Sequence, residues 1–517
     1  MKNFVGREIP DELLKDGKEV YQGKNYRDGR YLKKQGPRIV VREKPQESKI
    51  AASLREAIVK CGLKDGMTVS FHHHFRDGDY IANMVMKEIV DLGIKDITIA
   101  ASSLGTAHDP IAQYIEDGVV TGLQTSGIRG RMGEVVSQGK LKTPAILRSH
   151  GGRVRAIEEG DVHIDVAFIG APTSDECGNA RGKGGKSDCG VLSYAMVDAE
   201  YADKVVVITD TLVPFPNFPA SIQAIDVDYV VVVDQIGNPK KIASQAARLS
   251  KDPRDLMMAE SCAKVMAACP YFKDGFSFQT GAGGPSLAVN RFIEPLMVER
   301  GIKIRWAIGG ITSPMVDLLN KGLVDCIVDA QDFDIPSVQS VVTNRSHYEI
   351  STSQYANPAN KGAFVNKLDF VVLAALEVDT DFNVNVITGS DGVLRGAPGG
   401  HPDAAAGSKC CIVVTPLVRG RMATICESVV TVTTPGECVD VVVTDYGIAV
   451  NPLRSDIAGW LDEAGIAHTT INALQEKAYS LVGRPDPLEW NDKVVAILEA
   501  RDGTILDVVR EIKPYQM

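Results

Sequence analysis

The stretch that decides the fold occurs twice in the chain. KDGMTVSF at residues 64–71 opens an apolar segment that ends in GIKDITI at residues 93–99. KDGFSF at residues 273–278 opens a similar segment that ends in GIKIRW at residues 301–306. Both copies predict a turn, a strand, a loop, a long helix, another turn and another strand. A repeat of this length predicts two similar α/β domains in one polypeptide.

The repeat divides the chain into three predicted parts. We expect an N-terminal arm over residues 1–47, a first α/β domain over 48–238, and a second over 239–517 that carries a C-terminal extension of helices and strands. Runs such as 165–169 and 205–208 are apolar on both faces, as in parallel strands covered by helices. In open α/β sheets ligands bind beyond the carboxyl ends of the strands, so the segments that follow strands should carry the chemistry.

Composition excludes several classes of protein. Hydrophobic residues make up 44% of the 517 positions and charged residues 24%, as in an ordinary globular protein. A net charge of −10 argues against nucleic acid as a partner. No apolar run approaches the roughly 18 residues of a membrane helix, and the first residues lack the apolar core of a signal peptide. The ten cysteines have neither CxxC nor metal-ligand spacing, so we expect reduced thiols and a cytoplasmic protein.

Two glycine segments follow strands of the second predicted domain. TGAGGP at residues 280–285 stands between a predicted strand and a predicted helix, where its amides could bind an anion or an oxyanion. It lacks the third glycine of a dinucleotide fingerprint. Glycine is also used for packing in many such turns, and that alternative stays open. The candidate catalytic residues are Gly281, Ala282, Gly283, Gly284, Gly309 and Gly310.

Polar residues follow the first strand and fill a long loop at 392–403. Three consecutive histidines leaving a strand point to alternating sides and cannot chelate one ion, so we predict no metal there. Cationic and hydrogen-bonding side chains at these two places could bind the carboxylate groups of a substrate. Packing histidines and a surface loop are the structural alternatives. The candidate substrate-binding residues are His72, His73, His74, Arg76, Arg395 and His401.

A basic stretch over residues 135–157 contains no acidic side chain. It is either a solvated basic face or an anion site for cofactor phosphates. A glycine- and lysine-rich loop at 182–187 lacks full phosphate-loop spacing, so we infer no nucleotide hydrolysis. The residues predicted to contact a CoA-type arm are Gly399, Gly400, Asp403, Lys140, Lys142, Arg148, Arg153 and Arg155.

Four stretches together resemble the alpha subunits of citrate lyase, which belong to the CoA-transferase superfamily. They are KDGMTVSFHHHFR at 64–76, FQTGAGGPSLAV at 278–289, GGHPD at 399–403 and VVTDYGIA at 442–449. The likeness runs over nearly the whole chain. It implies a tandem pair of open α/β domains of the NagB/RpiA/CoA-transferase-like type, with the active site between them.

The resemblance also implies a reaction, citrate CoA transfer. Such a subunit exchanges the acetyl group on an acyl carrier protein for citrate, which releases acetate and forms a citryl thioester. The cofactor is a CoA-type thioester: acetyl-CoA or the phosphoribosyl-dephospho-CoA arm of the carrier. The implied partners are a beta subunit that cleaves the citryl thioester, the gamma acyl carrier protein and further copies of the chain, and no metal is expected on this subunit.

One departure from acetate-type relatives bears on mechanism. Those enzymes place a nucleophilic glutamate near the position of Gly309, and no glutamate stands between Arg300 and Val328 here. The sequence therefore favours direct attack by citrate on the acetyl thioester, through a mixed anhydride. The alternatives are an acetate-type CoA-transferase or acyl-CoA hydrolase, a citramalate lyase alpha subunit, and a scaffold without activity. Sugar-phosphate isomerases share the single-domain fold but lack the tandem arrangement.

Overall fold

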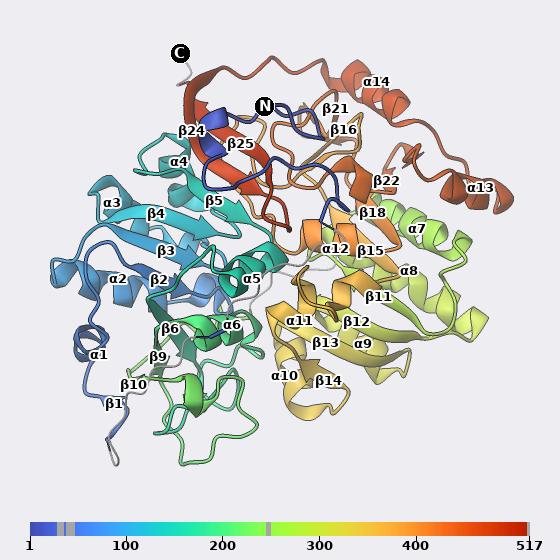
Figure 1. Cartoon of the computed structure of the whole chain (residues 1–517). Helices are drawn as coiled ribbons and strands as arrows, with labels where there is room; N and C mark the ends of the chain where they lie inside the picture. Colours follow the sequence, from blue (N-terminus) through green and yellow to red (C-terminus); the bar gives the residue numbers. More distant parts are fainter. Residues whose placement is uncertain (28–35, 38–46, 244–249, 514–517) are drawn as a thin grey trace.

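Two large sheets organise the chain (Figure 1). The structure is a computed structural model that describes residues 1–27, 36–37, 47–243 and 250–513. The first sheet and its helices lie on one side of the molecule, and the second sheet with its helices lies on the other. The architecture is therefore mixed α/β, as predicted, with mainly parallel sheets.

The first sheet has ten strands, which are parallel except for the last pair. In spatial order the strands are β1 (Ile50–Ala51), β10 (Tyr229–Val232), β9 (Lys204–Thr209), β6 (Val166–Ala171), β2 (Thr68–Phe71), β3 (Ile97–Ala101), β4 (Val120–Thr125), β5 (Ala145–Arg148), β24 (Trp490–Glu499) and β25 (Ile505–Ile512).

The second sheet has eight strands, again with one antiparallel pair at its end. Its spatial order is β14 (His347–Glu349), β13 (Val324–Asp332), β12 (Ile304–Ile311), β11 (Phe276–Thr280), β15 (Phe370–Ala374), β18 (Cys410–Val414), β22 (Val441–Thr444) and β23 (Gly447–Val450). Alternate residues of β15 face opposite sides of the sheet. Phe370 and Val372 join one core, whereas Val371 and Leu373 join the other, which is why the sequence of this strand is continuously apolar.

Helices cover these sheets, and several short strands form within the connecting loops. The helices of the first part are α1 (Leu54–Lys60), α2 (Ile81–Asp91), α3 (Ile111–Glu116), α4 (Gly130–Ser137), α5 (His150–Glu159) and α6 (Ser193–Tyr201). Those of the second are α7 (Pro253–Ala268), α8 (Gly284–Arg300), α9 (Ser313–Asn320), α10 (Ile335–Thr343), α11 (Thr352–Ala356), α12 (His401–Gly407), α13 (Ser455–Glu463) and α14 (Ile471–Val482). The short strands are β7 (Thr173–Ser174), β8 (Ala180–Arg181), β16 (Glu377–Asp379), β17 (Val384–Asn385), β19 (Val418–Arg419), β20 (Met422–Ala423) and β21 (Ile425–Cys426).

The repeat forms the elements that its pattern predicts. The segment at 64–99 yields β2, α2 and β3, and the segment at 273–306 yields β11, α8 and β12. Helix α7, the first helix of the second part, begins at Pro253 after an Asp252 cap, and residues 244–249 lie outside the described part. Among the described helices, none has the length and apolar character to traverse a bilayer.

The C-terminal hairpin corrects the predicted domain division. Strands β24 and β25, expected to extend the second domain, continue the first sheet, because β24 pairs in parallel with β5. A buried ion pair of 2.6 Å between Arg148 on β5 and Glu499 on β24 joins them. The described part of the arm packs on this hairpin: Asn3 donates to the carbonyl of Leu506, and the Tyr21 amide donates to that of Ile505. Residues 28–35 and 38–46 of the predicted arm lie outside the described part.

Candidate active site

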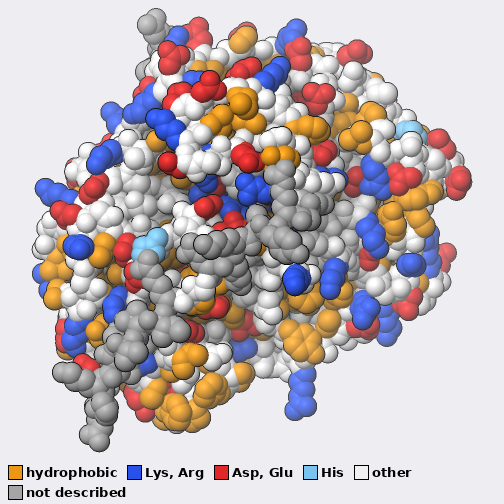
Figure 2. Space-filling view, viewed as in Figure 1, with side chains coloured by type: hydrophobic (Ala, Val, Ile, Leu, Met, Phe, Trp, Pro, Cys, Tyr) orange, Lys and Arg blue, Asp and Glu red, His pale blue; other side chains and the backbone are white. Residues whose placement is uncertain are grey.

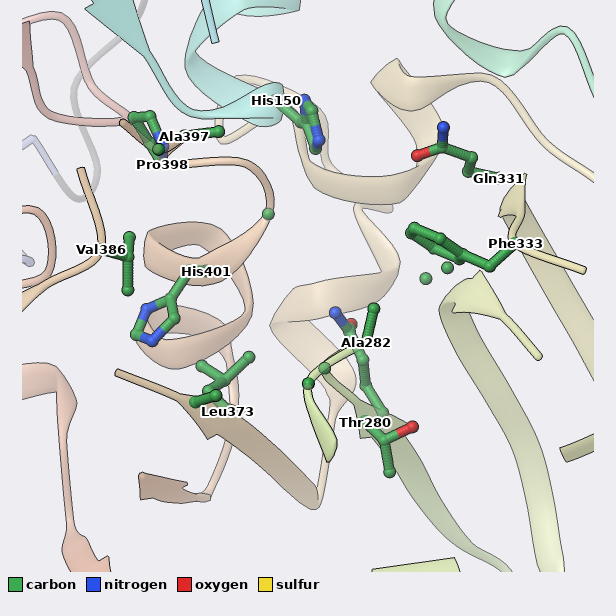
Figure 3. A pocket seen from close by; sticks show the side chains of 18 of the residues that line it. His150, Thr280, Ala282, Gln331, Phe333, Leu373, Val386, Ala397, Pro398 and His401 are labelled. Carbon is green, nitrogen blue, oxygen red and sulfur yellow. The ribbon is translucent and has the colours of Figure 1, made fainter. Parts of the chain in front are cut away.

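A cavity of about 500 Å³ lies where the carboxyl ends of strands from the second sheet face helices of the first part. Figure 3 shows its wall, with Thr280 and Ala282 after β11, Gln331 and Phe333 at the end of β13, and His401 on α12. The first part contributes Arg129, His150 and Tyr194. Strand ends from one part and helices from the other therefore enclose one site.

The charge of this cavity has a single sign. Among the described residues that line it there is no aspartate or glutamate, whereas three arginines line it: Arg129, Arg395 and Arg419. The Arg419 guanidinium donates to the carbonyl of Ala375 at 3.0 Å, and Arg395 pairs with Asp391. Asp391 therefore compensates one of the three arginines, but it is not among the lining residues, and a wall that presents arginines suits an anionic ligand.

The glycine turn after β11 presents main-chain amides to this cavity. Gly281, Ala282 and Gly283 line it, and Gly284 begins α8 immediately beyond. The first amides of a helix have no partner within the helix, and no side chain caps α8. Of the predicted catalytic amides, that of Gly281 is already used, because it donates to the carbonyl of Val372 at 2.8 Å. The amides at the start of α8 are thus the ones available to an anion.

The second glycine pair also lies at the cavity. Gly309 has φ +102°, and a Cβ there would lie 2.9 Å from Cδ of Gln279. A Cβ at Gly310 would lie 1.7 Å from Cε2 of Phe333. Both glycines line the cavity themselves, and their lack of a side chain leaves room for two further lining side chains, those of Gln279 and Phe333.

The three histidines separate as strand geometry predicts. His72 lies 3.0 Å from the buried Asp198, and His74 contacts the carbonyl of Gly170 at 2.9 Å. Both are buried in the first part, so our prediction that they bind substrate was wrong. The side chain of His73 points the other way, and its Nε2 lies 3.2 Å from Oε1 of Gln331, which lines the cavity.

His73 and Arg76 form a layer directly behind the cavity wall. The His73 ring packs on the rings of His150 at 5.5 Å and Tyr194 at 4.6 Å. Burial, with the charges of His150 and Arg76, lowers the pKa of His73 well below its ordinary value, so the ring is neutral at pH 7. The Arg76 guanidinium lies 4.3 Å from the ring centroid of Phe333. Burial and the charge of Arg129 lower the pKa of Arg76 to about 10, so it remains a cation.

The loop at 392–403 reaches the cavity through some of its predicted residues. Arg395, Gly400 and His401 line it. His401 Nδ1 lies 2.7 Å from the Thr434 hydroxyl, while its Nε2 has no protein partner. Gly399 and Asp403 do not line the cavity. Asp403 accepts hydrogen bonds from Ser149 and from the amide of Gly151, and so joins α12 to α5.

The basic stretch is not a phosphate site at this cavity, which corrects a further prediction. Arg148, Arg153 and Arg155 are buried in ion pairs with Glu499, Asp198 and Glu159, respectively. Lys140 is exposed, and Lys142 pairs with Asp96 at 3.1 Å. None of the five lines the cavity. On the face in Figure 2, acidic and basic side chains are interspersed. The basic stretch itself contains no acidic residue, but Glu159 follows just after it, and Glu499 and Asp198 approach from distant segments.

Several residues that line the cavity were missed from the sequence. Gln279 ends β11 and donates to the Tyr355 hydroxyl at 2.9 Å. Gln331, near the end of β13, accepts from the Tyr194 hydroxyl at 3.3 Å. A polar side chain that closes a buried strand was the available signal for both. The remaining ones had no signal in the local sequence: Arg129, His150, Tyr194, Tyr355 and Arg419.

The fold and the cavity define an α/β protein with an arginine-lined cavity at the ends of parallel strands, and comparisons with known proteins give its family. A sequence model of the family "Citrate lyase, alpha subunit (CitF)" matches residues 47–512. The citrate lyase alpha chain of Escherichia coli K12 is 52% identical over 471 residues, which cover 91% of this chain and 92% of that protein. That of Klebsiella pneumoniae is 50% identical over 477 residues, which cover 92% and 94%. The chain belongs to the family of citrate lyase alpha subunits.

Solved structures give the same result. The alpha subunit of citrate lyase from Streptococcus mutans, determined in complex with citrate, superposes with a TM-score of 0.96 at 52% identity, covering 99% of this chain and all of that one. The malonate decarboxylase alpha subunit of Acinetobacter baumannii has a TM-score of 0.62 at 16% identity, covering 84% of this chain and 88% of that one. The second likeness concerns the fold alone.

Proposed function

We propose that this chain is the citrate CoA-transferase subunit of a citrate lyase and replaces the acetyl group of an acyl-carrier thioester by citrate. One observation carries the proposal: a cavity whose described lining holds three arginines and no carboxylate lies beside the free amides of a glycine turn. The arginines suit a tricarboxylate, and the amides suit the oxyanion of a thioester under attack. Membership of the citrate lyase alpha-subunit family supports this choice of acid.

In the proposed reaction, a citrate carboxylate oxygen attacks the carbonyl carbon of the acetyl thioester. The amides of Ala282, Gly283 and Gly284 bind the resulting oxyanion. The carbon–sulfur bond breaks, the carrier thiolate departs, and the mixed anhydride of citric and acetic acid remains. The thiolate then attacks the citryl carbonyl carbon, and acetate departs. Charge balances, because one carboxylate is consumed and another is released. No protein carboxylate is required, which agrees with its absence from the described lining.

Two features of the structure support the finer details. The two copies of the repeat place their strands in the same order. In the first sheet β2 lies next to β3 and β3 next to β4; in the second sheet β11 lies next to β12 and β12 next to β13. We infer a tandem duplication of the NagB/RpiA/CoA-transferase-like type, with the site between the copies. Arg395, Gly400 and His401 line the cavity and are our candidates to hold the pantetheine arm of the cofactor.

We further propose that the physiological thioester belongs to a gamma acyl carrier protein with a phosphoribosyl-dephospho-CoA arm, and that a beta subunit cleaves the product. Acetyl-CoA is the convenient substitute for a test. The purified chain is mixed with acetyl-CoA and citrate, and acetate is measured. Citrate-dependent release supports the proposal. Equal acetate release without citrate indicates an acyl-CoA hydrolase. Faster release with citramalate than with citrate indicates a citramalate lyase alpha subunit. No release with any acid defeats the proposal.

A trapping experiment separates the anhydride route from acetate-type transferases. Those enzymes form a thioester on a glutamate that borohydride reduces. We expect intact-mass spectrometry to find no covalent CoA adduct on this protein after incubation with acetyl-CoA, and no glutamate reduced to an alcohol when borohydride is then added. A stable adduct would refute the route.

A substitution distinguishes the enzyme from a scaffold that only organises partners. A Cβ at Gly283 would lie 3.0 Å from Cβ of Ala374, so Gly283→Leu should fill the turn and abolish transfer. Gly459→Leu, on α13 with open space around it, is the control and should be neutral. Full activity in Gly283→Leu would favour the scaffold.

A further inference from the structure

Three buried side chains behind the cavity wall form a cluster with no role in the proposed reaction. Asp329 and Asp332 belong to β13, and His347 belongs to the neighbouring β14 (Figure 1). Each offers one ligand atom, and these atoms all lie within 4.8 Å of one another. Asp329, Asp332 and His347 are 0%, 1% and 5% exposed. A cluster of two carboxylates and an imidazole at this depth needs an explanation.

The negative charge of the cluster is not compensated by other side chains. Both carboxylate oxygens of Asp332 lack a hydrogen-bond partner. Asp329 accepts from the amide of Gln331 at 2.7 Å and contacts Nε2 of His347 at 3.1 Å. Among the described residues, no lysine or arginine forms an ion pair with either aspartate. The positive charge of Lys183 favours the charged form of Asp329 without a direct contact, and the Lys183 ammonium donates its hydrogen bond to the carbonyl of Val341.

Adjacent buried carboxylates repel each other, and burial disfavours their charged forms. Either a shared proton or a bound cation must therefore compensate the pair. The next question is which of the two the surroundings favour.

The imidazole is held as metal-ligating histidines are. His347 Nδ1 lies 2.9 Å from the hydroxyl of Ser340, so Nδ1–H can donate outward while the Nε2 lone pair faces the two carboxylates. Gly190 closes the other side, since a Cβ there would lie 1.7 Å from Oδ2 of Asp332. Because Gly190 has no side chain, no side chain of this residue covers the Asp332 carboxylate. The loop that contains Gly190 nevertheless closes the cluster on this side.

We propose that Asp329, Asp332 and His347 bind a divalent transition-metal ion of the Mn²⁺ or Zn²⁺ type. Two carboxylates and one imidazole match the mixed oxygen and nitrogen preference of such ions, and the ion neutralises the two buried charges. This departs from our expectation that the subunit binds no metal. Asp329 and Asp332 flank Gln331 along β13. A bound ion would therefore fix the strand end that presents Gln331 to the cavity.

The test uses Mn²⁺, because the ten cysteines of the chain would bind Zn²⁺ nonspecifically. The full-length protein is stripped with a chelator and incubated with Mn²⁺, and free Mn²⁺ is followed by electron paramagnetic resonance. We expect about one tightly bound ion per chain and a higher melting temperature. Zn²⁺ should displace it, whereas Mg²⁺, which demands octahedral oxygen ligands, should not.

Variants locate the ion. Asp332→Asn should abolish binding and raise the melting temperature of the metal-free protein, because it removes the repulsion. Ser340→Ala should weaken binding by about 10-fold to 100-fold through the histidine. The control is Asp165→Asn in the more exposed triad of His163, Asp165 and Asp203, and it should bind normally. Wild type without bound Mn²⁺, Mg²⁺ displacing it equally well, or Asp165→Asn losing the ion while Asp332→Asn keeps it would overturn the proposal.

Discussion

The side chain of Gln279 occupies the space beside Gly309 that an amino acid with a Cβ would need. The distance from that Cβ to Cδ of Gln279 would be 2.9 Å, and Gln279 in turn donates to the hydroxyl of Tyr355. Gly309 at the end of β12 is thus a packing partner of an amide side chain that lines the cavity. The first prediction follows from this contact.

We expect Gly309→Ala to lower citrate-dependent acetate release and to cost about 1–3 kcal/mol of stability, because φ of +102° is strained for alanine and Gln279 must move. Gly322→Ala is the matched control: its φ is +71°, but nothing lies within 4 Å of the added Cβ. Thermal unfolding and acetate assays compare the two. Equal activity losses would show that the contact with Gln279 has no part in the reaction.

Arg129 should bind a citrate carboxylate. Its exposed side chain lines the cavity. Loss of a charge-assisted hydrogen bond costs about 1.5–3 kcal/mol, so Arg129→Met should reduce kcat/KM for citrate by about 10-fold to 100-fold. Arg131→Met is the control, since Arg131 pairs with Glu116 outside the cavity. Steady-state kinetics at varied citrate measures both, and an unchanged kcat/KM in Arg129→Met would remove Arg129 from the site.

Arg148 should matter for stability rather than for cofactor binding. It forms a buried pair with Glu499, where burial alone would raise the pKa of the glutamate but Arg148 and Lys18 hold it at about 2. Arg148→Met leaves that charge without its main partner and should cost about 3–5 kcal/mol. Lys142→Met breaks an exposed pair and should cost at most about 1 kcal/mol. Urea unfolding decides, and similar midpoints for the two variants would contradict the structure.

The buried His401 should make stability depend on pH. Burial lowers its pKa to about 4, although the Ala374 main chain favours the charged form. Unfolded histidine binds a proton below about pH 6.5. The unfolded state therefore gains more protons between pH 6.5 and 4, and stability falls with falling pH at up to about 1.4 kcal/mol per pH unit.

We expect the melting temperature of His401→Gln to fall less than that of wild type between pH 7 and 5. His468→Gln, which alters a half-buried histidine beside Asp462, should follow wild type. Parallel pH curves for His401→Gln and wild type would mean that the ring titrates alike in both states.

The alternating orientation of His72, His73 and His74 was predictable, because successive residues leaving a strand point to opposite sides. Which side faces the cavity was not, since that depends on where β13 places Gln331. Arg148 and Arg153 were misassigned for a related reason. Local sequence shows only that the basic stretch itself contains no acid, whereas Glu499 and Asp198 approach through folding.

The C-terminal hairpin illustrates the same limit. Its strands were recognisable from their apolar residues, but pairing with β5 joins segments about 350 residues apart, and no local pattern encodes such a contact. The sequence singled out Gly309 as a position without a nucleophilic side chain, but the neighbour that requires glycine there, Gln279, appeared only in three dimensions.

The sequence by itself determined the α/β class, the order of elements in the repeat, the glycine turn at the start of α8 and the family, because periodicity, turn residues and motif spacing are local properties. Only the tertiary structure decided which amides remain free and which histidine approaches the cavity. It also decided that the described lining of the cavity holds three arginines and no carboxylate, and that Asp329 and Asp332 meet His347. Those properties depend on distances between strands and helices remote in the chain, and burial sets the charges there through desolvation that no spacing reveals.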